Sequence, residues 1–229
     1  MLCKIAELIA DVPAADGLAI RCRDYLYTGK KRADITIRTE FYRPQFYGDN
    51  PTPEMVAYME SASQFYGELV KHNGFFLHAS AVVKDGKAYL FSGDSGVGKS
   101  THANLWIQTL GGDTRIINDD KPALRKIDGV WYAYGTPWCG KDGINLNEKA
   151  PIAGVCFMKQ AGENSIHRLN FDEAMKKILQ QTLFRFDNEQ LLDAFWESLS
   201  DFLEHIPVYE LENRPEPAAA QLSFQTMQV

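Results

Sequence analysis

The segment Gly93–Ser100 constrains the fold more than any other part of this sequence. It reads Gly-Asp-Ser-Gly-Val-Gly-Lys-Ser and matches the pattern Gly-x-x-x-x-Gly-Lys-(Ser/Thr) in full. Its glycines let the backbone turn so that N–H groups point at a phosphate, and a helix that starts beside them adds its positive end. The residues expected to hold the phosphates are Gly93, Asp94, Ser95, Gly96, Val97, Gly98, Lys99, Ser100 and Thr101.

The flanking sequence has what such a loop requires. The apolar run Tyr89–Phe91 predicts a strand before it, and Ser100–Leu110 predicts a helix that ends at Gly111. Lys99 can reach the β- and γ-phosphate oxygens, and the Ser100 hydroxyl can bind Mg²⁺, or Mn²⁺ in its place. The sequence has no Asn-Lys-x-Asp run of the kind that reads guanine, which favours ATP.

A second motif, Asn118-Asp119-Asp120, follows a short predicted strand at Arg115–Ile117. A metal-bound triphosphate needs a carboxylate at the end of a neighbouring strand. Two adjacent acids allow one to bind the metal and the other to act as a base for an attacking hydroxyl. An acidic turn without function is the alternative, but the position about twenty residues after the phosphate loop favours a site.

His78 lies in a predicted strand, Phe75–Val83, which forms a hairpin with Ala88–Ser92 around the turn Asp85-Gly86. Because the second strand leads into the phosphate loop, His78 could lie near the γ-phosphate or the metal. A hydrogen-bonded core histidine fits the sequence equally well.

The segment Gly135–Lys141 is a candidate loop at the substrate. It contains two glycines, Pro137 and Trp138, and Lys141 offers a cation to the γ-phosphate or the acceptor. The alternative is a structural turn with a packed tryptophan. Cys139 has no histidine beside it in the sequence and is not expected to be a nucleophile.

The remaining pattern predicts strands in the middle of the chain and helices around them. Thr52 and Pro53 open a helix, and Asp187 is a candidate N-cap for a later one. Other expected elements are strands at 34–38, 124–127, 130–134, 152–158, 165–169 and 206–211, and helices at 172–185 and 188–204. Hairpins beside the phosphate loop indicate an α/β fold of mixed α+β type, with a mixed sheet flanked by helices rather than an all-parallel sheet.

We expect one domain over residues 1–229. Its nucleotide-binding core is expected at 71–212, with 1–70 as an extension packed on it and 213–229 as a loosely held tail.

Composition excludes several classes of protein. With 24 Lys and Arg against 30 Asp and Glu, the net charge is −6, so nucleic acid is not an expected partner. The four cysteines are widely spaced, which indicates reduced thiols rather than a disulfide or zinc framework. We find no signal peptide and no long apolar run. The expected location is the cytoplasm, without a membrane partner.

Together the motifs resemble a known family. The order of His78–Ala81, a hairpin, Gly93–Thr101 and Asn118–Asp120 is similar to the catalytic core of HPr kinase/phosphorylase and ATP-type phosphoenolpyruvate carboxykinase, over roughly residues 70–160. The resemblance implies that His78 and both aspartates surround the transferring group beside Lys99. It implies Asp119 as the base and Asp120, with Ser100, as the metal ligand.

Departures from the family narrow the expected function. Thr101 stands where HPr kinases usually have Glu, and the chain lacks the room for a carboxykinase's N-terminal domain. The sequence looks more like small HPr-kinase-related proteins, some of which phosphorylate a serine on a peptide. We therefore expect an ATP-dependent kinase acting on Ser or Thr of a peptide or small protein. The alternatives are a non-catalytic nucleotide-gated regulator and a small-molecule kinase or phosphorolytic enzyme. Self-association into a homo-oligomer stays open.

Overall fold

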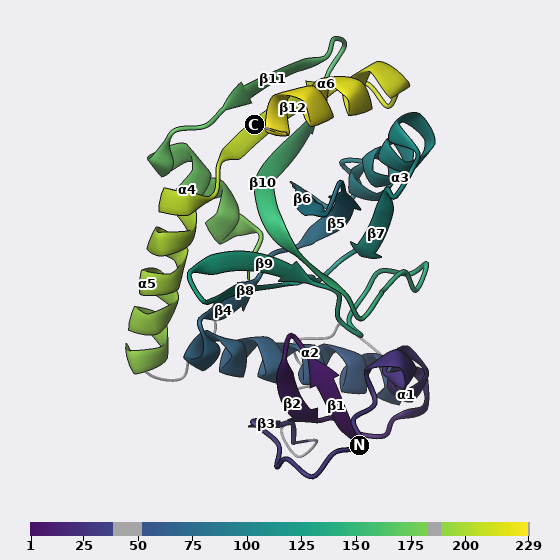
Figure 1. The fold of residues 1–229 in the computed structure, drawn as a ribbon, viewed down its shortest axis with the longest axis vertical. Coiled ribbons are helices and arrows are strands. Elements are labelled where there is room, and N and C mark those ends of the chain that lie inside the picture. Colours follow the sequence, from purple (N-terminus) through teal and green to yellow (C-terminus); the bar gives the residue numbers. More distant parts are fainter. Residues whose placement is uncertain (39–51, 183–188, 229) are drawn as a thin grey trace.

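The computed structural model describes residues 1–38, 52–182 and 189–228. A mixed sheet of nine strands forms its centre, in the order β4-β8-β9-β10-β6-β5-β7, with β12 beside β10 and β11 beside β12 (Figure 1). The mixed α+β architecture expected from the sequence is thereby confirmed. The strands are β4 (Gly74–Phe76), β5 (Ala79–Lys84), β6 (Lys87–Ser92), β7 (Arg115–Asn118), β8 (Ala123–Ile127), β9 (Val130–Tyr134), β10 (Lys149–Gln160), β11 (Ser165–Arg168) and β12 (Val208–Asn213).

Strand β10 pairs with three other strands and thereby connects the two parts of the sheet. Its residues 149–151 pair antiparallel with β9, whereas later residues pair parallel with β6 on one side and β12 on the other. Its register with β6 shifts between Ile152 and Gly154, where a bulge bends a strand and increases its twist. One long strand thus joins the antiparallel strands β4-β8-β9 to β6, the strand that leads into the loop expected to bind phosphate.

The strand expected over Phe75–Val83 is divided in two. β4 pairs with β8, while β5 pairs with β6 and β7, and Leu77-His78 connects them. The sequence suggested one strand because most of the stretch is apolar, but its two halves belong to different parts of the sheet. The expected β5–β6 hairpin is confirmed, with positive φ angles of 50° at Asp85 and 74° at Gly86 that suit a two-residue turn.

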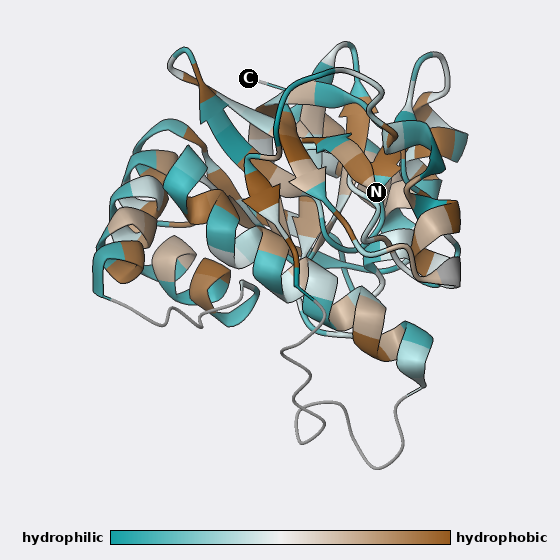
Figure 2. Cartoon of the chain, turned by 90° about the horizontal axis from the view of Figure 1, so that it is seen from below, coloured by the Kyte–Doolittle hydropathy of each residue, from teal (hydrophilic) through white to brown (hydrophobic). Residues whose placement is uncertain are grey.

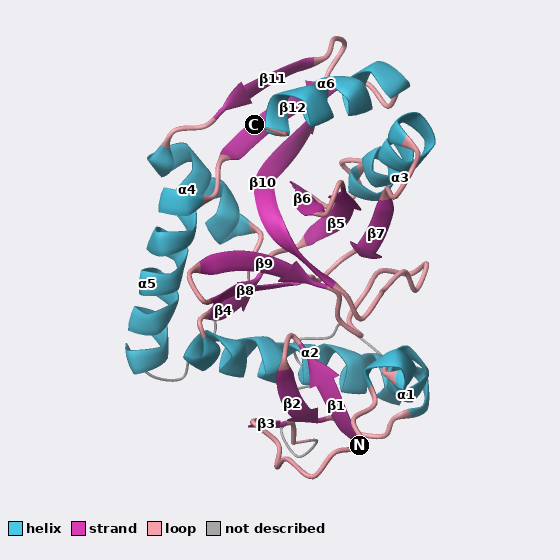
Figure 3. Ribbon diagram, in the orientation of Figure 1, coloured by secondary structure: helices cyan, strands magenta, loops and turns pink. Residues whose placement is uncertain are grey.

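Helices cover both faces of the sheet (Figure 3). One buried cluster joins α4 and α5 to strands that include β4, β5 and β8, and another joins α3 and α6 to the opposite face. Figure 2 shows apolar residues concentrated on the central strands, while the helices carry both apolar and polar residues. The helices are α1 (Asp16–Arg21), α2 (Pro53–Leu69), α3 (Lys99–Leu110), α4 (Phe171–Gln180), α5 (Glu189–His205) and α6 (Pro217–Met227).

The N-terminal residues form a small layer of their own. Strands β1 (Leu2–Ile5), β2 (Leu8–Asp11) and β3 (Ile35–Thr36) make a three-stranded sheet, and α2 lies between this sheet and β4-β8-β9 (Figure 1). Thr52 caps α2 as expected, since its side chain accepts a hydrogen bond from the Met55 backbone. The expected cap Asp187 lies outside the described residues. In the described ranges, no helix is long and apolar enough to cross a bilayer.

The tail expected to be loosely held is instead the helix α6. Its residues Ala219, Ala220, Ser223 and Met227 are buried against α3 and the sheet. The Ser223 hydroxyl also accepts a hydrogen bond of 2.9 Å from the Trp106 indole nitrogen. The prolines at 215 and 217 suggested a loosely held tail, but Pro217 occupies the first turn of a helix, where proline is tolerated.

Neighbouring alanines in α6 provide a direct test of this packing. Ala220→Glu places a charge in a fully buried position, whereas Ala218→Glu places it on the exposed side of the same helix. We expect Ala220→Glu to lower the free energy of unfolding by about 3 kcal/mol and Ala218→Glu by under about 0.5 kcal/mol. Urea unfolding followed by circular dichroism measures both; equal losses would show that α6 is not docked.

Candidate phosphate-binding and acid-base site

The phosphate loop connects the end of β6 to the first turn of α3. Three of its glycines, Gly93, Gly96 and Gly98, have positive φ angles of 137°, 82° and 110°, a backbone conformation that L-residues with side chains rarely adopt. A Cβ atom at Gly93 would also lie 3.1 Å from the Met158 carbonyl oxygen on β10. The glycine spacing is therefore required by the loop backbone and by close strand packing.

The side chain of Lys99 lies inside this loop. Its ammonium donates hydrogen bonds to the carbonyl oxygens of Gly93, at 2.9 Å, and Asp94, at 3.1 Å, and the residue is only 8% exposed. Burial lowers the pKa of Lys99, while the carboxylates of Asp120, Asp119 and Asp94 act in the opposite direction. Both predicted aspartates therefore lie near enough to influence the charge of Lys99, although the two motifs are about twenty residues apart in sequence.

Asn118 shapes the turn that carries the two aspartates. It is the last residue of β7 and fully buried, and its Oδ1 accepts hydrogen bonds from the backbone nitrogens of Asp120, at 3.0 Å, and Lys121, at 2.7 Å. In such an Asx turn, the side-chain oxygen accepts the backbone hydrogen bonds that a neighbouring strand would otherwise accept, at the point where the strand ends. Its Nδ2 donates to the Thr136 carbonyl at 3.0 Å, which fixes the turn to the segment after β9.

Asp119 is held by a hydroxyl and covered by a glycine. The Ser80 hydroxyl donates to Asp119 Oδ1 at 2.5 Å, and Asp119 is 7% exposed. A Cβ atom at Gly140 would lie 3.2 Å from the Asp119 backbone oxygen and 3.7 Å from its Oδ2. The segment after β9 therefore closes over this carboxylate, and the absence of a side chain at Gly140 allows the approach.

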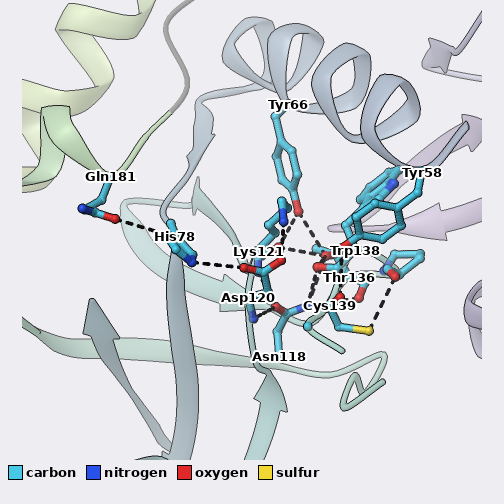
Figure 4. A network of polar contacts seen from close by, with 12 residues as sticks. Tyr58, Tyr66, His78, Asn118, Asp120, Lys121, Thr136, Trp138, Cys139 and Gln181 are labelled. Atoms are coloured by element: carbon cyan, nitrogen blue, oxygen red, sulfur yellow. Dashed lines mark hydrogen bonds and ion pairs between the residues drawn. The ribbon is translucent and has the colours of Figure 1, made fainter. Parts of the chain in front are cut away.

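Asp120 is the centre of a charged network (Figure 4). His78 Nε2 lies 3.2 Å from Asp120 Oδ1, and the Lys121 ammonium contacts Oδ2. Burial raises the pKa of Asp120, but the His78 hydrogen bond and the Lys121 charge outweigh it and hold this pKa below the ordinary value. Asp120 is thus a stably ionised carboxylate whose oxygens each keep a further lone pair for a cation.

Gln181 is a site residue that the sequence analysis missed. Its Oε1 lies 3.1 Å from His78 Nδ1, its backbone oxygen accepts from the His78 nitrogen at 2.8 Å, and its Nε2 donates to Asp94 Oδ1 at 3.2 Å. It therefore links the phosphate loop to the histidine. Gln181 follows the last turn of α4, about a hundred residues after His78, so no local pattern could have identified it.

The expectation that Trp138 contacts a substrate is wrong. Trp138 is fully buried in the core formed with α2, where its ring lies 4.8 Å from that of Phe65 and its indole nitrogen donates to Ser61 at 2.9 Å. The alternative of a structural turn with a packed tryptophan therefore describes this position. Lys141 is exposed, and its role at an acceptor stays a prediction.

Tyr66 and Thr136, which the sequence did not single out, support the turn from the side of α2. The Tyr66 and Thr136 hydroxyls both donate to the Lys121 carbonyl oxygen, and they lie 3.0 Å from each other.

Cys139 is buried, like the other three cysteines, and all four are unbridged. Burial raises the pKa of Cys139, which agrees with its exclusion as a nucleophile.

The oxygen donors at the site fit a hard cation such as Mg²⁺. The Ser100 hydroxyl in the first turn of α3 and the ionised Asp120 carboxylate are the ligand types that Mg²⁺ takes when phosphates and water complete its shell. Within the described residues, no three His, Cys, Asp or Glu side chains form a cluster able to hold a metal ion. If Ser100 and Asp120 were to hold Mg²⁺, phosphate oxygens and water would have to supply the rest of its shell.

The chain was compared with protein family models, curated proteins and solved structures, and matches came from the solved structures. No protein family model matches the chain, and no curated protein matches it. Matching solved structures include the Hpr(Ser) kinase/phosphatase from Coxiella burnetii, at 12% sequence identity and a TM-score of 0.39, over 66% of this chain and 89% of that one. This distant likeness does not establish a family. The function proposed below therefore rests on the residues of the site.

The pKa of Asp120 offers a test of the network. In His78→Leu the lowering hydrogen bond is lost while burial persists, so the Asp120 pKa should rise. His167→Leu, at an exposed histidine on β11, should leave it unchanged. Carboxyl ¹³C shifts recorded against pH measure it; an unchanged Asp120 pKa in His78→Leu would contradict the network.

The same pKa predicts how stability depends on pH. Because the pKa is depressed in the folded state, the stabilisation from Asp120 is fully present above the ordinary carboxyl pKa and is lost as the pH falls through the folded value. In His78→Leu this contribution to acid sensitivity should shrink. Unfolding free energies measured between neutral and acidic pH would show whether it does.

Proposed function

We propose that this protein is an ATP-dependent phosphotransferase that moves the γ-phosphoryl group to a hydroxyl, on Ser or Thr of a peptide or small protein. One observation carries the proposal: the Lys99 ammonium is buried inside the loop, where it donates to the Gly93 and Asp94 carbonyl oxygens, and the carboxylates of Asp119 and Asp120 favour its charged form. Passive anion binding needs the loop and the lysine. A pair of carboxylates beside them is what transfer to a hydroxyl requires.

The loop and the start of α3 would bind the triphosphate. Backbone N–H groups of Gly93–Ser100, the helix N-terminus and Lys99 supply the positive potential. Ser100 and Asp120 would hold Mg²⁺, which when bound neutralises charge on the phosphates. The balance of charge favours this assignment for Asp120, because its pKa is held low and it therefore stays ionised beside the cation.

Asp119 is the better candidate for the base. Its Oδ1 accepts the Ser80 hydroxyl hydrogen bond, which orients the carboxylate and leaves Oδ2 as the atom to take a proton from an acceptor hydroxyl. Asp120, by contrast, is engaged by both His78 and Lys121. The neighbouring acids would thus have different functions because different partners hold them.

His78 and Gln181 would position the transferring group. His78 touches Asp120, and Gln181 joins His78 to Asp94 of the loop, so the two ends of the site keep a fixed separation. The choice of a peptide or small protein as acceptor follows from the resemblance of the sequence to small HPr-kinase-related proteins, some of which phosphorylate a serine on a peptide.

Two substitutions separate binding from transfer. Asp119→Asn should lower the transfer rate by about 10²–10⁴-fold with little change in Mg·ATP affinity, because the loop and Lys99 remain. Lys99→Ala should lose most of the binding itself. The matched control is Asp128→Asn in the β8–β9 turn, where φ is 49° and asparagine is well tolerated.

The measurement uses γ-³²P-ATP with Mg²⁺ and a library of synthetic peptides that each contain one Ser or Thr. Label in peptides for the wild type and Asp128→Asn, but not for Asp119→Asn, supports the proposal. If Mg·ATP binds and label reaches neither peptide nor water, transfer to a peptide hydroxyl is refuted, and the nucleotide-gated module and the small-molecule kinase are the readings left.

A further inference from the structure

The segment that closes over Asp119 is held from outside the central sheet. Gly140, whose missing side chain allows the close approach to Asp119, lies in the loop of residues 135–148 between β9 and β10. A Cβ atom at Gly140 would also lie 3.8 Å from the Cβ atom of Asp120. The backbone at Gly140 is thus close to both acids of the site, and the groups that fix this backbone also fix the space around the two carboxylates.

Arg21, in the last turn of α1, binds this loop. Its Nη1 atom lies 2.9 Å from the Cys139 carbonyl oxygen, 2.8 Å from the Cys139 sulfur and 3.2 Å from the Gly140 carbonyl oxygen. The Asn145 side chain donates to the Arg21 carbonyl oxygen at 3.3 Å and to the Thr136 carbonyl oxygen at 3.2 Å. Side-chain hydrogen bonds therefore join the end of α1 to the loop at three places along the chain.

Tyr58 on α2 is a second anchor for the same segment. Its hydroxyl donates to the Cys139 carbonyl oxygen at 2.9 Å (Figure 4). Burial and the Asp120 charge raise the pKa of Tyr58, so the hydroxyl keeps its proton at neutral pH. The Arg21 guanidinium lies 5.3 Å and the Lys121 ammonium 5.5 Å from the centre of the Tyr58 ring, within the range of cation–π contacts. Tyr58 thus contacts both the cation that binds the loop and the cation that pairs with Asp120.

The contacts of Arg21 are confined to this one segment. Within the part of the chain that the structure describes, its guanidinium donates hydrogen bonds only to Cys139 and Gly140 and forms no ion pair with a carboxylate. A guanidinium is charged throughout the physiological pH range and holds its donors in a fixed plane. These properties suit a side chain that fixes a loop, since a catalytic group keeps its geometry only where neighbouring side chains and hydrogen bonds support it.

We propose that Arg21 is a positioning residue for phosphoryl transfer: together with Tyr58, it holds the Cys139–Gly140 segment where it keeps the Asp119 carboxylate covered. The inference rests on the proposed function, and it gives the N-terminal layer a role in the reaction. Arg21 acts through the segment and not on the reacting atoms. Without it, the segment would move away, water would reach Asp119, and the acceptor hydroxyl would lose its fixed place. A displacement of about 1 Å is enough to lower a rate by about 10²-fold.

The kinetic test uses Mg²⁺, γ-³²P-ATP and the synthetic Ser/Thr peptide that the wild type labels best. Arg21→Met should lower kcat by about 10²-fold, counted per Mg·ATP site titrated by calorimetry, while the Mg·ATP affinity stays unchanged. Arg21→Lys keeps a charged donor and should recover about tenfold of that loss. The matched control is Arg23→Met, at an exposed arginine that lies 4.0 Å from Asp24, and it should behave as the wild type. A raised peptide KM at unchanged kcat in Arg21→Met would overturn the inference, because Arg21 would then bind the acceptor directly.

The Cys139 thiol reports the position of the segment without any turnover. Cys139 is 2% exposed and its sulfur contacts Arg21, so Arg21→Met should raise its rate of alkylation by iodoacetamide at least about tenfold. Because Arg21 also lowers the Cys139 pKa, its loss disfavours the thiolate, and faster alkylation can come only from exposure. Tyr58→Phe should give a smaller increase, and buried Cys156 should stay unmodified, which excludes general unfolding. Protection of Cys139 as in the wild type would overturn the inference.

The outcomes separate this inference from the proposed function. If the wild type labels a peptide and Arg21→Met labels it at the same rate, the inference fails and the proposed function stands. If the wild type labels no peptide, the proposed function itself fails, and the positioning role fails with it.

Discussion

The rest of the site depends on the burial of one ammonium group, that of Lys99, which two backbone carbonyl oxygens bind and nearby carboxylates stabilise. Lys99 is almost fully covered, and Asp94, Asp119 and Asp120 each favour its charged form. A buried charge is tolerated only where opposite charges and hydrogen bonds compensate for lost solvation. The loop after β6 and the turn after β7 therefore have to lie close together, and the sheet order allows this because only β5 lies between β6 and β7.

The two aspartates show how environment separates chemically identical groups. Asp120 is joined to His78 and Lys121, whereas Asp119 receives the Ser80 hydroxyl and lies beneath Gly140. One carboxylate is thus part of a charged network, and the other accepts a neutral hydroxyl. This asymmetry gives the proposed division into metal ligand and base a physical basis that the sequence Asp-Asp alone lacks.

Most secondary structure was predictable because its signals are local. The hairpin turn at Asp85-Gly86, the cap at Thr52 and the helix after the phosphate loop depend on residues within one or two turns of each other. The errors have the opposite origin. The division of the strand at His78, and the docking of α6 through Ser223, depend on pairings with segments far away in sequence.

The sequence by itself determined the phosphate loop, the strand and helix around it, and the identity of the acidic pair, since these reside in contiguous residues with fixed backbone requirements. Tertiary structure decided which side chains meet there. Gln181 reaches His78, and Trp138 enters the core formed with α2. Each position follows from long-range packing and strand order, and periodicity along the chain carries no information about either.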